Sequence, residues 1–239
     1  MMLNRLSKTF ATGAILGASA LALAAAPPFA KPAPGGKSLV VPADDAAKGT
    51  VYHALSGRDQ QIFFQSDAPL EKIKGGSNQV IGYAVAGRDS PANLQAGEWQ
   101  LPVKSIRTGI ELRDEHLAGK DWLDAESHAD IVFQVSGVKS IKEARKTDKF
   151  SSYTATLTGD MTIHGVTRPL TITGAAITLL PASEQTAKIA KGDLMSIRAT
   201  YSVSLSDYEV SHAVIGDKVA NDVEITTTLY LSTVKPEDQ

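Results

Sequence analysis

The chain has 239 residues, with 24 Lys and Arg against 26 Asp and Glu, and a net charge of −2 at pH 7. A nearly neutral chain is a poor candidate for nucleic-acid binding, which takes most of its affinity from neutralised phosphates. Cysteine is absent, which excludes a disulfide framework, a cysteine-ligated zinc site and a lipidated N-terminal cysteine.

Residues 1–26 have the pattern of a secretory signal peptide. Arg5 and Lys8 precede an uncharged run rich in Ala and Leu, which ends in small residues before Pro27. The run is only weakly hydrophobic for a permanent span of about 20 residues, so we expect cleavage and a periplasmic or secreted protein. Residues 27–49 are rich in Pro, Gly and Ala, and we expect them to form a flexible leader.

Alternating apolar and polar residues predict strands along the next part of the chain. One strand, 61–66, has Ile62, Phe63 and Phe64 in succession, which is typical of a strand covered on both faces. Gly75 to Asn78 is a turn signal between strands. The strands expected before and after the helix described next are 50–55, 61–66, 79–86, 93–105 and 129–137.

One short helix interrupts the alternation within 108–124, and it should end near Gly119. Residues 138–150 are rich in Lys and Arg, and we expect an exposed hairpin connection there. A phosphate or headgroup site in this connection is the less favoured alternative, because runs of charge are usually solvated.

The clearest pattern lies between Tyr153 and Leu180. From Tyr153 to Ile163 every odd position is apolar or small and every even position is polar, a period of two that predicts an antiparallel strand with one buried face. The parity changes after Ile172, which predicts a bulge near Gly174. Strands at 197–205 and 223–231 follow, and residues 235–239 form a polar tail.

These segments add up to one all-β domain over residues 50–234, with about eight strands and one short helix. Closure into an antiparallel β-barrel would remove exposed strand edges and leave room for one slender ligand. Small residues on the predicted inner face, such as Gly82, Gly159 and Ala199, fit either a cavity or close backbone packing. The candidate ligand-binding residues are the large inward-facing ones: Phe63, Ile81, Tyr83, Val85, Trp99, Leu101, Ile131, Phe133, Val135, Leu157, Met161, Ile163, Ile172, Tyr201, Val203, Ile225 and Leu229.

Two segments resemble a known family. The hairpin GDMTIHGVTRPLTITG, residues 159–174, resembles the signature of the YceI-like family of exported lipid-binding proteins. An upstream run is also similar to that family, with Ser105 to Gly109, Arg113-Asp114 and Asp121 to Asp124 in order. The resemblance implies an extended, lipocalin-like barrel whose tunnel holds a long-chain lipid, namely a quinone-like polyisoprenoid or a fatty-acid-type molecule. It also implies transient contact with a membrane or a membrane b-type cytochrome, and it leaves a homodimer open.

The chain departs from the family pattern in places. Gly82-Tyr83-Ala84 stands where the family usually has Gly-x-Phe, so Tyr83 brings a hydroxyl into the expected apolar wall. No catalytic set or metal-ligand spacing is present, and no cofactor is required. His164 is better explained as a turn residue whose ring bonds a carbonyl than as a general base, and Arg168 as a carbonyl ligand than as a headgroup contact. The alternatives are an exported enzyme using His164 or His116 and an interaction module with a filled core.

Overall fold

The computed structural model describes residues 38–57 and 60–239, so the expected signal peptide and the first part of the leader lie outside the described residues. The structure is built of strands with two α-helices, α1 (Ala43–Ala46) and α2 (Glu111–Ala118), and short 3₁₀ turns. Within the described ranges no helix is long and apolar enough to cross a membrane. The strands are β1 (Gly49–Ala54), β2 (Ile62–Asp67), β3 (Lys72–Ser77), β4 (Ile81–Gly87), β5 (Leu94–Pro102), β6 (Asp130–Lys146), β7 (Ser151–Ile163), β8 (Val166–Leu180), β9 (Leu194–Ser204) and β10 (Asp222–Ser232).

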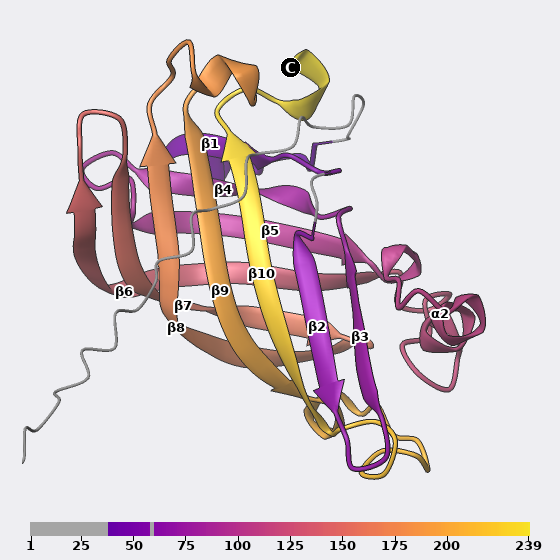
Figure 1. Cartoon of the computed structure of the whole chain (residues 1–239). Helices are drawn as coiled ribbons and strands as arrows, with labels where there is room; N and C mark the ends of the chain where they lie inside the picture. The colour runs from indigo at the N-terminus through magenta and orange to yellow at the C-terminus, as the bar shows by residue number, and fades with distance from the viewer. Residues whose placement is uncertain (1–37, 58–59) are drawn as a thin grey trace, which may run out of the picture.

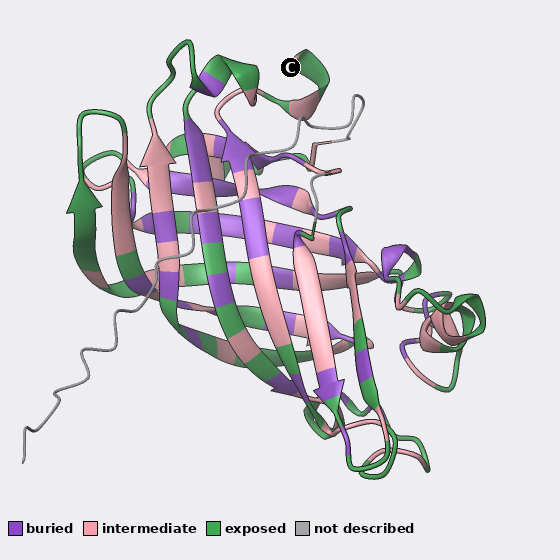
Figure 2. Ribbon diagram, viewed as in Figure 1, coloured by how far each residue is buried: buried purple, intermediate pink, exposed green. Residues whose placement is uncertain are grey.

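The strands form a closed antiparallel barrel. They lie in the order β1-β4-β5-β6-β7-β8-β9-β10, and β1 also pairs with β10, which closes the eight-stranded ring (Figure 1). The ring explains the alternating burial along β8, β9 and β10, where each second residue faces the interior (Figure 2). The predicted all-β antiparallel barrel is therefore confirmed.

The hairpin of β2 and β3 occupies the remainder of the β10 edge. β1 pairs with β10 only at Leu231 and Ser232, and β2 takes over from Val223 to Thr227. β3 then bonds to the segment after β5, because the Gly76 N–H donates to the Arg107 carbonyl and the Arg107 N–H donates to the Gly76 carbonyl, both at 2.9 Å. The hairpin thus covers the side of the barrel next to α2.

The expected turn at 75–78 is wrong, because its glycines belong to β3. A Cβ on Gly75 would lie 2.5 Å from the Phe64 ring, and one on Gly76 would lie 2.3 Å from the carbonyl oxygen of Ile62. These glycines serve close approach between strands rather than chain reversal.

Three further features bear on the predictions: the length of β6, the bulge near Gly174 and the end of α2. Residues 138–146 continue β6 instead of forming a connection. The register of β6 with β7 shifts three times, between Val135 and Gly137, between Lys139 and Lys142 and between Glu143 and Arg145, and these shifts obscure the period of two. The bulge predicted near Gly174 is confirmed by a register shift opposite Ala155 and Leu157, and Gly174 has a φ of 72°. α2 ends at Gly119 as expected.

Residues 38–49 of the expected flexible leader are packed against the barrel. Leu39 and Val41 contact the outer faces of β1, β4 and β5, and the Tyr83 hydroxyl donates to Asp45 at 2.7 Å. Ser38 donates from its hydroxyl and its N–H to Glu237 of the tail, at 2.6 and 2.8 Å. We call residues 38–48 the strap. It begins outside the barrel and covers an apolar part of its outer surface.

Candidate functional site

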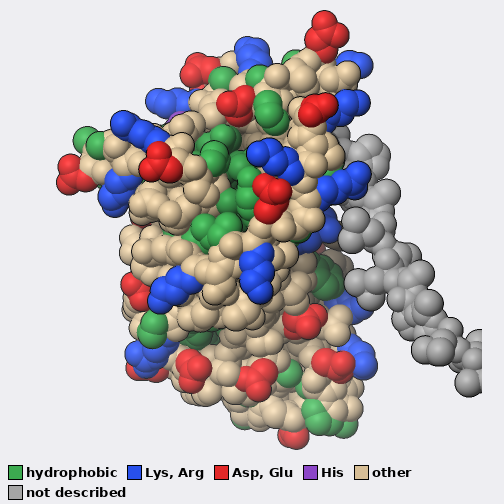
Figure 3. Space-filling view, turned by 90° about the vertical axis from the view of Figure 1, so that its left-hand side faces the viewer, with side chains coloured by type: hydrophobic (Ala, Val, Ile, Leu, Met, Phe, Trp, Pro, Cys, Tyr) green, Lys and Arg blue, Asp and Glu red, His purple; other side chains and the backbone are tan. Residues whose placement is uncertain are grey.

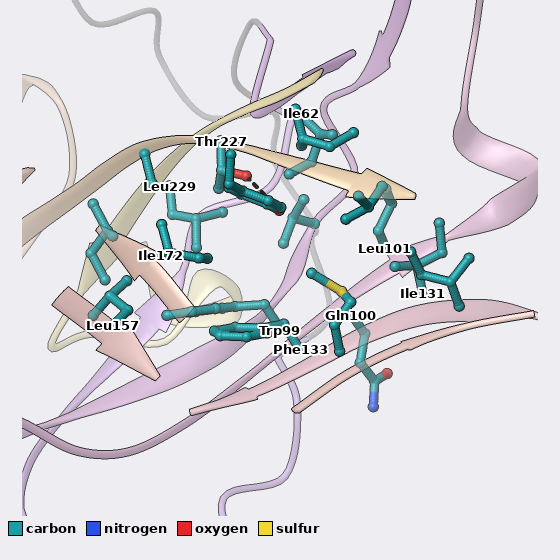
Figure 4. A pocket seen from close by; sticks show the side chains of 18 residues that line it. Ile62, Trp99, Gln100, Leu101, Ile131, Phe133, Leu157, Ile172, Thr227 and Leu229 are labelled. Atoms are coloured by element: carbon teal, nitrogen blue, oxygen red, sulfur yellow. Dashed lines mark hydrogen bonds between the residues drawn. The ribbon is translucent and has the colours of Figure 1, made fainter. Parts of the chain in front are cut away.

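The barrel encloses an inner cavity of about 100 Å³. Its wall comes from inward positions of β5 to β10, among them the pairs Tyr201 opposite Ile225 and Ala199 opposite Thr227. β2 completes this wall, since Ile62 pairs with Thr227. The side chains around the cavity are almost all hydrocarbon, as the close-up shows (Figure 4).

Two stacked aromatic rings form one side of the inner cavity. Trp99 and Phe133 have ring centroids 5.7 Å apart and planes 13° apart. A Cβ on Gly82 would lie 2.9 Å from Cδ1 of Trp99, and one on Gly159 would lie 2.6 Å from Cζ of Phe133. These two glycines therefore make room for the rings, whereas Ala199 and Thr227 border open space.

The inner cavity contains few polar groups. The Tyr201 hydroxyl and the Thr227 hydroxyl lie 3.2 Å apart and share a hydrogen bond. Burial raises the pKa of Tyr201, so its hydroxyl stays protonated. The Gln100 amide points away from the other side chains in Figure 4. The inner cavity is thus uncharged.

A larger outer cavity of about 280 Å³ adjoins the inner one. The two cavities share lining residues from six strands, so they lie directly against each other. Together they exceed the roughly 300 Å³ at which pockets for drug-sized ligands begin. The shared residues are Ile62, Leu101, Ile131, Ile163, Val203 and Ile225.

The outer cavity ends in a charged mouth between α2, the β2–β3 hairpin and the loop before β10. Its charged and imidazole side chains are Glu71, Arg113, His116 and Lys218. Nη2 of Arg113 lies 2.5 Å from Oε1 of Glu71. At this mouth the apolar interior of the barrel meets solvent.

Comparison with known proteins assigns this barrel to a family. The family model described as "YceI-like domain" matches residues 54–231. The chain belongs to the YceI-like family. One stretch is 37% identical over 73 residues to a UPF0312 protein of Pseudomonas savastanoi pv. phaseolicola, and one is 46% identical over 59 residues to a UPF0312 protein of Pseudomonas fluorescens. These matches span 30% and 25% of this chain, and only 33% and 26% of the two relatives.

Solved structures share the family fold at low identity. BcnA of Burkholderia cenocepacia aligns with a TM-score of 0.51 and 20% identity, over 71% of this chain and 94% of its own. A polyisoprenoid binding domain from Saccharophagus degradans, implicated in plant cell wall breakdown, aligns with a TM-score of 0.51 and 10% identity, over 77% and 98%. At such identities the likeness concerns the fold alone.

Most of the candidate residues lie in the cavity wall of this YceI-like barrel. They come from strands with an unambiguous period of two, β5 to β10. Whether they touch a lipid is a separate question, addressed as a proposal below. The candidates that line the cavity are Trp99, Leu101, Ile131, Phe133, Leu157, Met161, Ile163, Ile172, Tyr201, Val203, Ile225 and Leu229.

Five candidates lie elsewhere. Val135 is buried in the main core without bordering the cavity. Ile81, Tyr83 and Val85 occupy the outer face of β4, where Tyr83 and Val85 pack under the strap. Phe63 is on the face of β2 opposite Ile62 and Phe64, which line the cavity instead.

The parity of β4 was assigned wrongly because both of its faces are apolar. Large residues alternate with Gly82, Ala84 and Ala86, and hydrophobicity favoured the large set for the interior. The inward face of β4 packs beside the Trp99 side chain, which leaves room only for small residues at these positions. The strap supplies the apolar cover that the large residues need outside.

Other wall residues were missed. Ile197 is in phase with Tyr201 and Val203, so the alternation of β9 could have found it, and Ala199 was placed on the inner face but not among the candidate ligand-binding residues. The mouth was out of reach of any such signal, because its residues come from a helix and loops that have no period of two. Among them are Leu117, Val210, Val214 and Val219.

The family hairpin is architectural. His164 and Gly165 form its two-residue turn with φ of 51° and 74°, the geometry that suits a tight hairpin. His164 Nδ1 lies 3.4 Å from the carbonyl oxygen of Tyr208, and Arg168 Nε donates to that of Asp207 at 3.0 Å. Both favoured interpretations agree with these contacts, which hold the loop that carries Val210 against the barrel.

No metal centre accompanies the cavity in the part of the chain that the structure describes, since no group of three or more His, Asp or Glu side chains lies close enough to hold an ion. His128 and His164 meet edge to face at 5.1 Å between centroids, and His212 stacks on Trp122 at 4.8 Å. These imidazoles are packing elements.

Proposed function

We propose that this protein is exported and binds a long-chain lipid, a polyisoprenoid of quinone-like type or a fatty-acid-type molecule, for transport, storage or protection against stress. The observation that carries the proposal is the pair of adjoining apolar cavities, which extends from the Trp99–Phe133 pair to the mouth beside α2. The alternative, an interaction module, requires only a filled core, whereas the interior of this barrel contains two cavities.

The binding energy would come from buried area. At about 25 cal/mol per Å², hiding roughly 400 Å² of lipid chain contributes on the order of 10 kcal/mol before the costs of ordering the ligand are subtracted. The inner wall offers few polar groups, the Tyr201 and Thr227 hydroxyls and the unpaired indole N–H of Trp99, so selectivity there would depend mainly on length and girth. The polyisoprenoid-binding relative of similar fold supports this class of ligand.

Binding is favoured over catalysis by the placement of the imidazoles. His164, the best sequence candidate for a general base, is occupied with the Tyr208 carbonyl in a hairpin turn. His116 lies at the mouth, where no hydrogen bond or ion pair joins its ring to the Glu71 carboxylate among the described residues.

Transient contact with a membrane is part of the proposal. The mouth is flanked by exposed apolar side chains: Leu70, next to Glu71, is 72% exposed, and Ile110 and Leu112, beside Arg113, are 50% and 61% exposed. Apolar side chains in such a position would enter a lipid surface and let a ligand pass between bilayer and cavity without crossing water. A membrane b-type cytochrome and a second copy of this chain are further partners that the family resemblance suggests.

The test is extraction of the mature protein, purified from the periplasm or culture medium of its host. Organic extraction followed by mass spectrometry should recover a long-chain lipid in a fixed ratio to protein. Failure to recover such a lipid, combined with failure of the extracted protein to take up polyisoprenoids or fatty acids, would sink the proposal. Recovery of uncleaved protein from the cytoplasm would contradict export.

A further inference from the structure

The two ends of the cavity differ in polarity. The inner cavity is lined only by uncharged residues. At the other end, Glu71, Arg113, His116 and Lys218 all border the outer cavity. A molecule lying along the whole space would therefore meet hydrocarbon at one end and charge at the other, which is the arrangement that suits an amphiphile in one orientation.

The mouth has an excess of positive charge. Arg113 and Lys218 face the single carboxylate of Glu71 among the residues that line it. This contrasts with the whole chain, whose net charge is −2. The cationic excess is thus local to the end of the cavity.

Arg113 retains bonding capacity. One guanidinium carries five N–H donors, and its contact with Glu71 at 2.5 Å uses one nitrogen. The side chains of Arg113 and Glu71 are 30% and 37% exposed, so solvent screens the pair and a second anion can reach it. Lys218, which is exposed, stands across the same mouth.

Resting on the lipid-binding function above, we infer that the mouth is an anion subsite. Arg113 and Lys218 bind the carboxylate or phosphate head of an amphiphile whose chain lies in the barrel, and Glu71 is a resident carboxylate that the head displaces from Arg113. Carboxylate and phosphate share the chemistry that a guanidinium recognises, through charge-assisted hydrogen bonds.

The experiment compares matched ligands that differ only in the head. Oleate is paired with oleyl alcohol, and geranylgeranyl phosphate with geranylgeraniol. Each displaces a neutral fluorescent dye, N-phenyl-1-naphthylamine, from the delipidated mature protein. We expect at least one anion to bind about tenfold more tightly than its alcohol. The pair that shows the larger ratio distinguishes a fatty acid from a prenyl phosphate.

Substitutions of the cations and of the carboxylate should change the affinity for the anion in opposite directions. Arg113→Gln and Lys218→Gln should each weaken binding of the anion about threefold to tenfold, because the mouth is partly exposed, and should leave the alcohol unchanged. Glu71→Gln should strengthen binding of the anion by a similar factor. Lys74→Gln and Glu115→Gln, exposed residues that do not line the cavity, make the same charge changes and should have no effect.

The outcomes separate this inference from the proposed function. Alcohols that bind as tightly as anions, or variants that weaken both heads equally, would overturn the anion subsite and leave lipid binding intact. If none of the four molecules binds and no lipid is extracted, the proposed function itself fails.

Discussion

Two apolar surfaces of this barrel are covered in different ways. On the outer face of β4, Tyr83 and Val85 are covered by the chain itself, since Leu39 and Val41 of the strap pack on them. In the interior, the residues around Ala199 and Tyr201 border a space that no protein side chain fills. The first surface is finished by folding and the second is left for a ligand. Apolar area alone does not distinguish a binding site from a core; what covers it does.

The largest effect is expected from filling the interior. Ala199→Phe puts a ring into the inner cavity, so lipid capture should fall by at least about tenfold while the protein stays folded, because overpacking costs about 1–3 kcal/mol and here the ring enters open space. Lipid per protein, measured by mass spectrometry, and thermal unfolding check the two parts. Thr200→Phe, which points outward from the same strand, is the control. Undiminished lipid content in Ala199→Phe would contradict the assignment of the cavity.

The aromatic side of the cavity should be sensitive to a single methyl group. Gly159→Ala would place a Cβ 2.2 Å from the carbonyl oxygen of Gln134 and 2.6 Å from the Phe133 ring. We expect a loss of about 2 kcal/mol in the free energy of unfolding, measured by urea titration. Gly137→Ala, whose Cβ would meet only Thr158 Oγ1 at 3.7 Å, should change it by less than about 0.5 kcal/mol. Equal effects of the two would mean that Phe133 moves freely.

The strap should be weakened by removing one hydroxyl. Tyr83→Phe deletes the 2.7 Å bond to Asp45 and should lower stability by about 1 kcal/mol. Proteolysis within residues 38–48 should accelerate, with lipid binding unchanged. Tyr153→Phe removes a hydroxyl that makes no hydrogen bond to the described residues, and it serves as the control. A loss of lipid in Tyr83→Phe would place Tyr83 at the ligand after all.

Acid should release the strap. Bonds from Ser38 lower the pKa of Glu237 from 4.5 to about 2, and bonds from Lys48 and then Tyr83 lower that of Asp45. A lowered folded-state pKa means that the contribution to stability is present above the unfolded value and is lost as the pH falls through the folded one. Protection of the amides of residues 38–48 against hydrogen exchange, measured relative to the unfolded chain at the same pH, should therefore fall between about pH 4.5 and pH 2. Glu237→Gln combined with Asp45→Asn should remove that dependence, and an unchanged profile would refute it.

The smallest effect concerns apolar side chains that nothing covers. Leu70→Ser with Leu112→Ser should reduce flotation of the protein with phospholipid vesicles a few fold, because each exposed side chain adds little area. Val40→Ser is the matched control, since Val40 is 87% exposed and lies on the strap. If Val40→Ser has the same effect as the leucine substitutions, contact with the membrane is not specific to the mouth.

The sequence predicted the barrel because its strands have one apolar and one polar face. Where that condition holds, as from Leu157 to Ile163, the inward residues were assigned correctly. Where both faces are apolar, as in β4 and at Ile62 to Phe64, the choice of face depended on neighbours distant in sequence, namely Trp99 and the strap. Gly75 and Gly76 were likewise assigned to a turn because their role depends on residues of another strand, Phe64 and Ile62, that lie against them.

The mouth could not be predicted for a related reason. Arg113, Lys218 and Glu71 come from a helix, a loop and a hairpin end, and only the closure of the barrel brings them together. The family hairpin shows the converse. The motif that identified the family, around His164 and Arg168, holds a loop rather than the ligand.

The central claim is that a lipid chain occupies the barrel. The tryptophans of the protein can report on it by their fluorescence. Of its 2 tryptophans, Trp99 lines the inner cavity and Trp122 the outer one. A bound fatty acid with bromine near its methyl end should quench the fluorescence of Trp99 in the Trp122→Phe variant, and bromine near the carboxylate should quench Trp122 in the Trp99→Phe variant. Ala199→Phe should abolish the first effect. A bound lipid that leaves Trp99 unquenched, wherever its bromine lies, would contradict the account.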